Sequence, residues 1–430
     1  MRLKRVPQSF LLPALLILGV SGCQASEGSG EGGGPDAPKD GVVDGSASRV
    51  LPGVDVLLAD SLHLVRERRA GLITNHTGID ARGLPTIDRL AATPGVALVS
   101  LFSPEHGIRG TVRGGDAIES GRDEATGLPI HSLYGETRKP TPEMLEGLDI
   151  LLFDIQDVGA RYYTYVSTMA LAMEAAGEAG IPFVVLDRPN PIGGMAVQGN
   201  VLDPEYSTFV GLYPIPMRHG MTPGELARLF VGEFGMEVKL HVVPAAGWRG
   251  DMMFHDTGLP WVPPSPNMPS EESALHYPGT CLFEGTNISV GRGTDRAFQL
   301  LGAPWLDAQA LVEAMEAHGL PGVDFQAVRF TPESPGDGKF SGQEVPGVAL
   351  KATSREYDPT VTALALLLET HRMSGPRWAW RVSHFDRLAG TDEIRRGLET
   401  GASLEALHAG WEEALSGFRS LRAPYLIYPR

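Results

Sequence analysis

The chain has 430 residues, 42% of them hydrophobic, with 36 Lys and Arg against 52 Asp and Glu. The formal net charge of −16 argues against nucleic acid as a partner, because a phosphate backbone is bound through excess positive charge. Two cysteines cannot form a disulfide framework, so stability must come from the burial of hydrophobic residues.

The N-terminus has the pattern of an exported lipoprotein. Three positive charges and no acid lie in the first five residues, and an apolar run follows over residues 10–20. That run is too short to span a bilayer, so residues 1–22 are interpreted as a signal peptide. Val20-Ser21-Gly22-Cys23 is similar to a bacterial lipobox, which implies a lipid on the thiol of Cys23. The alternative is an ordinary signal peptide with an incidental cysteine.

Residues 23–50 are crowded with Gly, Ser, Pro and Asp and hold almost nothing that could enter a core. They predict a flexible tether with a span of roughly 28 Å. We therefore expect an exported protein that is attached to a membrane through lipid on Cys23, facing the periplasm, on the outer membrane or at the cell surface. Cys281 would then have no disulfide partner.

Between residues 70 and 243, short apolar runs alternate with amphipathic stretches, which predicts strands and crossover helices of a parallel α/β sheet. The expected strands are Ala70–Asn75, Val96–Phe102, Leu148–Asp154, Phe183–Asp187 and Val238–Val243. Helical spacing of apolar residues predicts a helix over 165–179. Thr222, Pro223 and Glu225 predict the start of another helix, with Thr222 as its N-cap and Glu225 completing a capping box.

A proline-dense stretch over residues 259–269 cannot be helix or central strand. We place a domain boundary there, which gives a catalytic domain over 51–270 and a smaller α/β domain over 271–430. Helices are expected over 308–318 and 360–372, and a helical pair over 392–415.

Polar residues follow the ends of four of the predicted strands. They are Asn75 and His76; Glu105 and His106; Asp154 and Asp157; and Asp187, Arg188 and Asn190. In open α/β sheets, ligands bind at this edge, so we expect these side chains to line a cleft. For any single aspartate, the alternative is a helix cap or a turn.

Several long strings resemble the exo-β-N-acetylmuramidase family, long catalogued as a domain of unknown function. They include Gly71-Leu72-Ile73-Thr74-Asn75-His76-Thr77-Gly78, Ser103-Pro104-Glu105-His106-Gly107-Ile108-Arg109-Gly110, Leu186-Asp187-Arg188-Pro189-Asn190-Pro191, Phe283-Glu284-Gly285-Thr286-Asn287 and Gly291-Arg292-Gly293-Thr294. The resemblance implies a glycosidase that removes N-acetylmuramic acid from the non-reducing end of peptidoglycan fragments. It also implies a Rossmann-like N-terminal domain, a smaller C-terminal α/β domain, an active cleft between them, and no metal or nucleotide cofactor.

Cleavage of a glycosidic bond needs an acid for the leaving oxygen and a second group that stabilises the oxocarbenium-like centre. Glu105, which matches the family's expected catalytic glutamate, is the predicted acid and base, and a structural carboxylate is the alternative. Candidates for the second group are Asp154, Asp157, Asp187 and Glu284, with Asp157 preferred; the sugar's own acetamido group is a further candidate. Alternatively, Asp157 forms a salt bridge with Arg161.

The lactyl carboxylate of N-acetylmuramic acid calls for guanidinium groups, which bind carboxylates in a bidentate manner. The expected arginines are Arg109, Arg161, Arg188 and Arg292. The other expected substrate contacts are Asn75, His106, Tyr162, Asp187, Asn190, Glu284 and Asn287, although an aromatic residue such as Tyr162 is more often part of the core.

Two other kinds of chemistry find little support in the sequence. His76, His106 and His219 lie beside glycine-bearing turns, but no H-x-x-x-H or H-E-x-x-H spacing predicts a metal site. No G-x-S-x-G elbow points to an esterase. The remaining alternatives are a peptidoglycan-binding lipoprotein without catalytic activity and a different cell-wall hydrolase.

Overall fold

In a computed structural model, residues 49–110 and 115–430 are described. They belong to one compact unit, Ala47–Arg430. The predicted signal peptide, Cys23 and nearly all of the predicted tether lie outside the described residues. Within the described part of the chain, no helix is both long enough and apolar enough to cross a membrane.

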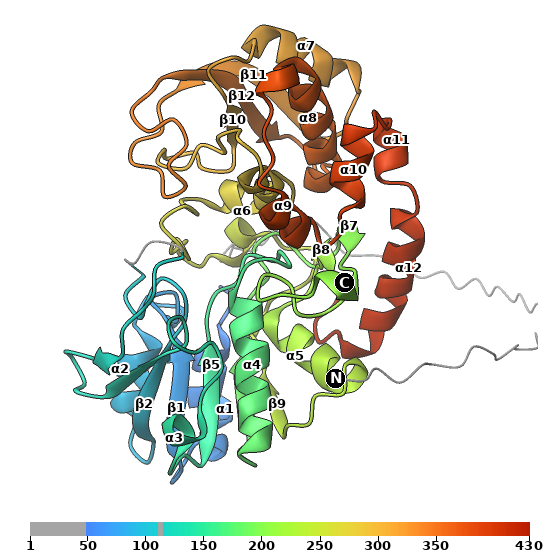
Figure 1. Ribbon diagram of the computed structural model, residues 1–430. Coiled ribbons are helices and arrows are strands. Elements are labelled where there is room, and N and C mark those ends of the chain that lie inside the picture. Colours follow the sequence, from blue (N-terminus) through green and yellow to red (C-terminus); the bar gives the residue numbers. More distant parts are fainter. Residues whose placement is uncertain (1–48, 111–114) are drawn as a thin grey trace, which may run out of the picture. The chain divides into compact units, whose positions relative to one another are not determined.

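A seven-stranded sheet forms the first part of this unit, in the order β3-β4-β2-β1-β5-β6-β9 (Figure 1). Its strands are β1 (Arg69–Thr74), β2 (Ala97–Ser103), β3 (Gly121–Arg122), β4 (Pro129–Ser132), β5 (Ile150–Asp154), β6 (Phe183–Leu186) and β9 (Leu240–Val243). All neighbours pair in parallel except β3, which runs antiparallel to β4 at the edge.

Counted in chain order, the parallel strands β4-β2-β1-β5-β6-β9 stand in the sequence 3-2-1-4-5-6, the strand order of a Rossmann fold. The order reverses between β1 and β5. The five strands predicted from apolar runs are confirmed as β1, β2, β5, β6 and β9. The expected α/β class with a Rossmann-like parallel sheet is therefore confirmed.

Alternate residues of the strands face two different layers of helices. Leu151 and Phe153 of β5 point into the core shared with α4 (Tyr165–Glu178) and α5 (Pro223–Glu233). Ile150 and Leu152 point into a second core with α1 (Gly53–Asp60) and α2 (Thr86–Ala91). This alternation follows from the two-residue period of a strand, and it makes the sheet doubly wound. A short helix, α3 (Pro142–Leu145), precedes β5.

The predicted start of α5 is confirmed. The Thr222 side chain accepts from the backbone N–H of Glu225, and the Glu225 side chain accepts from that of Thr222, with Pro223 at the first helical position. Such reciprocal capping satisfies backbone donors that the first helical turn leaves unpaired.

The second part is built on a three-stranded antiparallel sheet in the order β10-β12-β11. Its strands are β10 (Leu300–Gly302), β11 (Val323–Phe330) and β12 (Val345–Ala352), and its helices are α6 (Glu271–Thr280), α7 (Ala308–Ala317) and α8 (Pro359–Ser374). Helices α7 and α8 confirm the predictions, and the proline-dense stretch has neither helix nor strand, as expected. Beyond α9 (Val382–Ala389), the predicted helical pair is instead α10 (Glu393–Glu399), α11 (Leu404–Leu407) and α12 (Trp411–Arg422).

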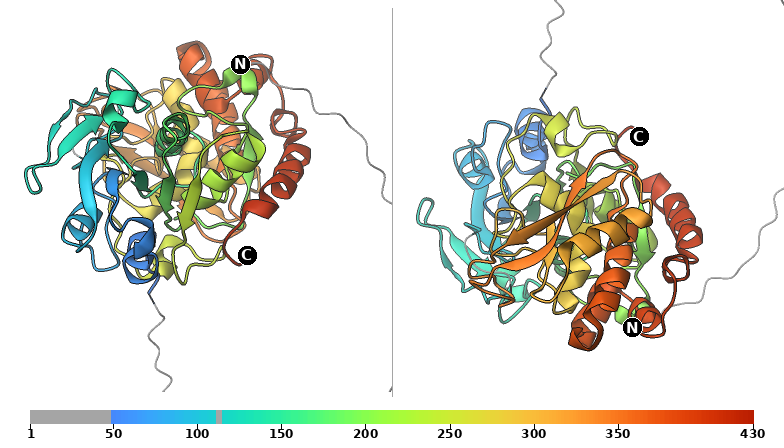
Figure 2. Two further views of the ribbon diagram at one scale, coloured as in Figure 1. Left: turned by 90° about the horizontal axis from the view of Figure 1, so that it is seen from below. Right: turned by 90° about the horizontal axis from the view of Figure 1, so that it is seen from above.

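The end of the chain returns to the parallel-sheet part, where α12 runs beside α5 (Figures 1 and 2). The Tyr428 hydroxyl donates to Asp187 at the end of β6, and Arg430 pairs with Glu225 of α5. A small antiparallel sheet of β7 (Gln198–Val201) and β8 (Pro216–Arg218) lies between the two parts. One buried hydrophobic cluster includes residues of both parts, so they share a core.

Candidate active site

A cavity of about 400 Å³ lies where the parallel-sheet part meets α6 and α9. Its residues come mainly from the loop after β2, the turn after β4, the segment that enters α4, the stretches around α6 and α9, and the loop between β11 and β12. The residues on which its chemistry depends are Glu105, His106, Tyr134, Arg138, Tyr162, Tyr163, Thr164, Glu284, Arg292, Asp337, Arg381, His384 and Arg387. The sequence placed Glu105, His106, Tyr162, Glu284 and Arg292 among the site residues, and the structure brings these five together.

Two hydrogen-bond donors converge on the carboxyl group of Glu105. The backbone N–H of Gly115 donates to Oε1 at 2.9 Å, and the Thr164 hydroxyl donates to Oε2 at 2.6 Å. Tyr134 lines the same cavity, and burial, reinforced by the charge of Glu105, raises the pKa of Tyr134 to about 12. The phenol therefore keeps its proton near neutral pH. Together the donors fix the orientation of Glu105 in the cavity.

The turn that carries Glu105 has an unusual backbone. His106 has φ 72°, in the left-handed region that non-glycine residues seldom adopt, and Gly107 continues it with φ 78°. Such a backbone conformation costs of order 1–3 kcal/mol of folding free energy. It persists where the surrounding structure enforces it, often at functional sites. The backbone N–H of Gly107 closes the turn on the carbonyl of Pro104 at 3.1 Å. This geometry presents Glu105 and His106 to the same cavity.

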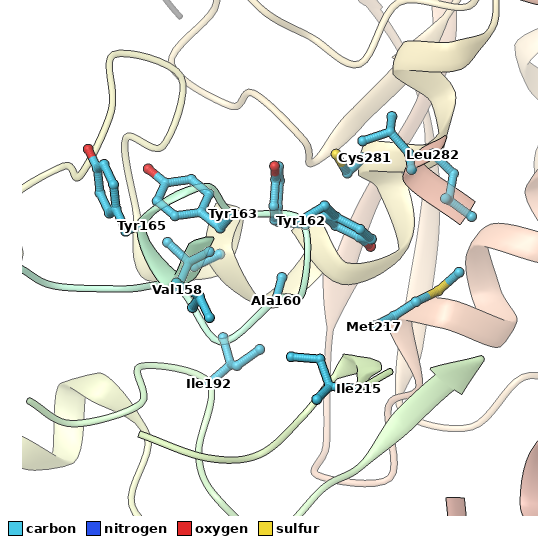
Figure 3. Close-up of a cluster of buried hydrophobic side chains, with 14 of the residues drawn as sticks. Val158, Ala160, Tyr162, Tyr163, Tyr165, Ile192, Ile215, Met217, Cys281 and Leu282 are labelled. Atoms are coloured by element: carbon cyan, nitrogen blue, oxygen red, sulfur yellow. The ribbon is translucent and has the colours of Figure 1, made fainter. Parts of the chain in front are cut away.

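Three tyrosines on the segment that enters α4 form one wall (Figure 3). Tyr163 and Tyr165 pack edge to face at 5.0 Å between ring centroids, and Tyr162 lies on the side toward Cys281. Tyr162 and Tyr163 both pack edge to face on Tyr277 of α6, at 5.5 and 5.6 Å. The Tyr162 hydroxyl donates to a backbone carbonyl of α6, so this ring is largely part of the core, the alternative considered from the sequence.

Glu284 and Arg292 form an ion pair in the cavity, with Arg292 Nε and Nη2 both contacting Glu284 Oε1. The neighbouring Glu284 carboxylate raises the pKa of Arg292 although burial opposes this, so the guanidinium stays charged. The free cysteine, Cys281, is buried with its Sγ 3.8 Å from Glu284 Oε2, and burial raises the pKa of its thiol. Cys281 is therefore a poor nucleophile.

Three further arginines line the cavity: Arg138, Arg381 and Arg387. Among the residues that the structure describes, none of the three has a carboxylate ion-pair partner. The Arg138 guanidinium lies over the ring of Phe209, and Arg387 Nη2 is 2.6 Å from Nδ1 of His384. Arg387 Nε is buried and has no hydrogen-bond partner in the part of the chain that the structure describes. In an acidic chain, such a cluster is suited to an anionic group of a ligand.

Sequence reasoning missed these arginines, together with Tyr134 and Asp337. Arg381 lies just before α9 and Arg387 lies within it, and no helix was predicted in this part of the chain. Arg138 lies in a turn whose sequence has no feature that suggests a binding site. A signal was present in the stretch 377–387, where three arginines alternate with two tryptophans and a histidine.

The structure places Asp154 and Arg188 outside the cavity, which corrects their assignment to the site. Arg188 Nε and Nη2 contact Asp154, at 2.5 Å for the Nε–Oδ1 pair, and both side chains are almost fully buried. The Thr86 hydroxyl donates to the same carboxylate. Because Asp154 is 0% and Arg188 3% exposed, neither side chain is accessible to a substrate in the cavity.

Asp187 is likewise internal. Its carboxylate accepts from the Thr222 hydroxyl at 2.7 Å, the Gly224 N–H at 2.8 Å and the Tyr428 hydroxyl at 2.6 Å. Burial raises its pKa to about 6 although these hydrogen bonds oppose the rise. Asp187 therefore joins β6, the start of α5 and the end of the chain.

Arg161 is buried among backbone carbonyls rather than in the cavity. It donates to the carbonyls of Asn200, Ile215, Leu388 and Ala389 at 2.8–3.2 Å. These partners lie on β7, on the segment before β8 and on α9. Arg161 thus connects the two parts of the unit, and burial lowers its pKa to about 10.

Asp157, the preferred second catalytic group, is 4% exposed and does not line the cavity. Its Oδ2 accepts from the Gly159 N–H at 2.7 Å, while Oδ1 has no hydrogen-bond partner among the described residues. Burial raises its pKa to about 7. The alternative salt bridge with Arg161 does not form either, since Arg161 donates only to carbonyls in the described part of the chain.

Four other expected contacts lie apart from the cavity. Asn75 accepts from Thr77, and Asn190 donates to the Met221 carbonyl, so both hold loops. Arg109 pairs with Asp123. Asn287 lies in a neighbouring groove. In the described residues, no group of three or more His, Cys, Asp or Glu side chains could hold a metal ion.

Comparisons with known proteins agree on one family. The family model described as exo-beta-N-acetylmuramidase NamZ, N-terminal, matches residues 70–272, and its C-terminal counterpart matches residues 275–428. A Bacillus subtilis (strain 168) protein named peptidoglycan beta-N-acetylmuramidase NamZ is 48% identical over 382 residues, which cover 88% of this chain and 92% of that protein.

Two solved crystal structures are similar, both of DUF1343 family proteins from Bacteroides fragilis NCTC 9343. The first has a TM-score of 0.83 at 37% identity and covers 88% of this chain and 99% of that chain. The second has a TM-score of 0.70 at 32% identity and covers 89% of this chain and 99% of that chain.

Proposed function

Because this chain belongs to the exo-beta-N-acetylmuramidase NamZ family, we propose that it is an exo-acting glycoside hydrolase. Its substrate would be a peptidoglycan glycan fragment, from whose non-reducing end it releases N-acetylmuramic acid. The observation that carries the proposal is the cavity in which Glu105, held by two donors, faces a cluster of arginines that have no carboxylate partner among the described residues.

Glu105 is assigned the role of general acid and base. A carboxyl group in this role protonates the leaving oxygen and later takes a proton from the attacking water. The two donors on Glu105 come from different segments of the chain, Gly115 from the loop after β2 and Thr164 from the start of α4, so the group has a defined position relative to a bound sugar. Positioning of this kind accounts for a large share of enzymatic rate enhancement.

Glu284 replaces Asp157 as the candidate second carboxylate. Of the four carboxylates considered from the sequence, Glu284 is the one that lines the cavity, and the other three are buried with partners in the protein. Its pairing with Arg292 keeps the carboxylate oriented beside the sugar site. In this position it would stabilise the positive charge that develops at the anomeric carbon, either directly or by orienting the acetamido group of the sugar.

The lactyl carboxylate is assigned to the arginines that have no carboxylate partner among residues 49–110 and 115–430, above all Arg387, whose buried Nε has no hydrogen-bond partner there. A carboxylate bound there would satisfy that donor and neutralise a charge that the protein leaves unbalanced. N-acetylglucosamine lacks the lactyl group, so the same cluster would select N-acetylmuramic acid.

The test uses a chromogenic N-acetylmuraminide and the matching N-acetylglucosaminide. We expect release of the chromophore from the first substrate and little from the second. Glu105→Gln keeps an oxygen for the Gly115 N–H, and its amide NH2 can donate to the Thr164 hydroxyl oxygen, but it cannot act as a general acid, so turnover should fall by about 10²- to 10⁴-fold. The exposed Glu146→Gln is the matched control and should retain activity. Release from neither substrate by the wild-type protein, or near-normal turnover by Glu105→Gln, would overturn the assignment.

Export and a lipid anchor on Cys23 are part of the proposal, and the sequence alone supports them. A tethered exo-enzyme would meet wall fragments before they diffuse away. Labelling of growing cells with a fatty-acid probe should mark the wild-type protein and a Cys281→Ala variant but not Cys23→Ala. A label that persists in Cys23→Ala would contradict the anchor.

A further inference from the structure

A second hollow lies next to the cavity and has a volume of about 390 Å³. Its lining includes Thr286, Asn287, Trp305, Phe340, Trp380 and Arg381, and we call it the aromatic groove. Trp305, Phe340 and Trp380 are each partly exposed, so their rings are available to a ligand. None of the catalytic assignments above uses these rings.

The aromatic groove continues the cavity. Arg381 lines both, and the loop 336–340 contributes Gly336 and Asp337 to the cavity and Gly338, Lys339 and Phe340 to the groove. Backbone pairing between residues 285–287 and 379–381 forms the common border, where the Arg381 N–H donates to the Gly285 carbonyl at 2.8 Å. A chain molecule cut in the cavity can therefore extend into the groove.

The rings and polar groups of the groove are held in place. Trp305 donates from Nε1 to the Ser374 hydroxyl at 2.9 Å and packs edge to face against Phe340 at 5.8 Å. Asn287 donates to the Arg377 carbonyl at 2.8 Å and accepts from the Ala379 N–H at 3.1 Å. Phe340 itself has φ 52°, a left-handed conformation that non-glycine residues seldom adopt.

The chemistry of this lining suits an uncharged sugar. Aromatic rings pack against the C–H faces of a pyranose, while amide and guanidinium groups bind its hydroxyls. The groove has space for about one or two sugar rings, given that ligand sites of small molecules begin near 300 Å³. The aromatic groove is lined by three aromatic side chains and only two charged ones, Lys339 and Arg381, whereas the cavity contains the arginine cluster.

We propose that the aromatic groove binds the part of the glycan on the leaving-group side of the scissile bond, beginning with the N-acetylglucosamine next to the released sugar. This inference rests on the proposed function. An exo-enzyme that also binds the leaving portion uses remote binding energy to position the bond, so longer substrates should be cut more efficiently.

The test compares a chromogenic N-acetylmuraminide with peptide-free glycan fragments that carry N-acetylmuramic acid at the non-reducing end. For wild type, we expect kcat/KM to rise from the aryl substrate to the disaccharide and the tetrasaccharide. Trp305→Ala should lower kcat/KM for the two glycans by about tenfold and leave the aryl substrate within about twofold. Trp411→Ala, a partly exposed tryptophan at the start of α12, is the matched control.

The outcomes separate the two proposals. If wild type cuts none of these substrates, the proposed function fails. If it cuts them but Trp305→Ala lowers all values equally, or none, the groove is not a glycan site and the proposed function stands. Should Trp305→Ala fail to fold, Phe340→Leu removes a ring from the same groove while keeping bulk, with the same expected pattern.

Discussion

The buried carboxyl group of Asp157 should make the protein less stable as the pH rises from about 4 to about 7. Burial raises its pKa from 3.8 to about 7. Above about pH 4 the unfolded chain releases this proton, while the folded protein keeps it until about pH 7. The contribution of the Asp157 carboxyl group to the free energy of unfolding is therefore complete below pH 3.8. It is lost as the pH rises through the pKa of the folded state, about 7. Asp157→Asn removes the ionisation in both states.

The size of the effect follows from the same two pKa values. A rise from 3.8 to about 7 corresponds to about 4 kcal/mol of unfavourable ionisation in the folded protein. Asparagine keeps an oxygen for the Gly159 N–H, which now donates to Asp157 Oδ2. Any change in hydrogen bonding caused by the new amide is independent of pH. Relative to wild type, Asp157→Asn should thus gain up to about 4 kcal/mol between about pH 4 and pH 8.

Urea unfolding followed by tryptophan fluorescence, at several pH values between about 5 and 8, measures this difference. Asp324→Asn, in an exposed position on β11, is the control for the general effect of losing a carboxylate. A stability difference between Asp157→Asn and wild type that stays constant over the whole pH range would refute the reasoning. We also expect Asp157→Asn to retain turnover, because Asp157 does not line the cavity; loss of turnover in a stable variant would return Asp157 to the catalytic residues.

Three further predictions concern single buried or cavity residues. Arg188→Met leaves Asp154 buried without its arginine and should cost about 3–5 kcal/mol of unfolding free energy, and a double variant with Asp154→Leu should recover part of it; a single variant as stable as wild type would contradict the buried pair. Burial, reinforced by nearby arginines, lowers the pKa of His219 to about 3, so its contribution to stability should be present above about pH 6.5 and lost as the pH falls toward 3. His219→Gln should flatten that part of the profile measured by urea unfolding, and an unchanged slope would disprove it. Arg387→Gln should raise KM for the chromogenic N-acetylmuraminide by about tenfold without a matching effect on any residual N-acetylglucosaminide turnover; equal effects would argue against a lactyl site.

The sequence predicted the parallel sheet well because its strands are buried on both faces. Such strands appear as continuous apolar runs, as in Leu148–Asp154, and the helices between them have a clear period. The antiparallel strands β10, β11 and β12 were not predicted. In β11 the residues alternate between buried and exposed positions only irregularly, and β10 has three residues, too few for a period to appear.

The candidate site was only partly predictable, for a different physical reason. A polar residue at a strand end has the same sequence signature whether it faces a cleft or is bonded inside the protein. Glu105 faces the cavity, whereas Asp154 and Asp187 are bonded to Arg188, Thr222 and other internal partners. These partners lie 34 and 35 residues away along the chain, and one sequence does not reveal such contacts.

The internal bonding of Asp154 also explains where the cavity lies. In a Rossmann fold, ligands bind at the point where the strand order reverses, which here is between β1 and β5. That position is occupied by the Asp154–Arg188 pair and by the hydrogen bond from the Thr74 hydroxyl to the Asp154 carbonyl at 2.7 Å, and a space of only about 10 Å³ remains beside it. The ligand space is instead beyond the ends of β2 and β5, where the second part of the unit supplies the opposite wall. The buried Asp154–Arg188 pair thus fills the place where a Rossmann fold would bind a nucleotide, and the proposed sugar site is built instead from Glu105, the tyrosines and the arginines at α9.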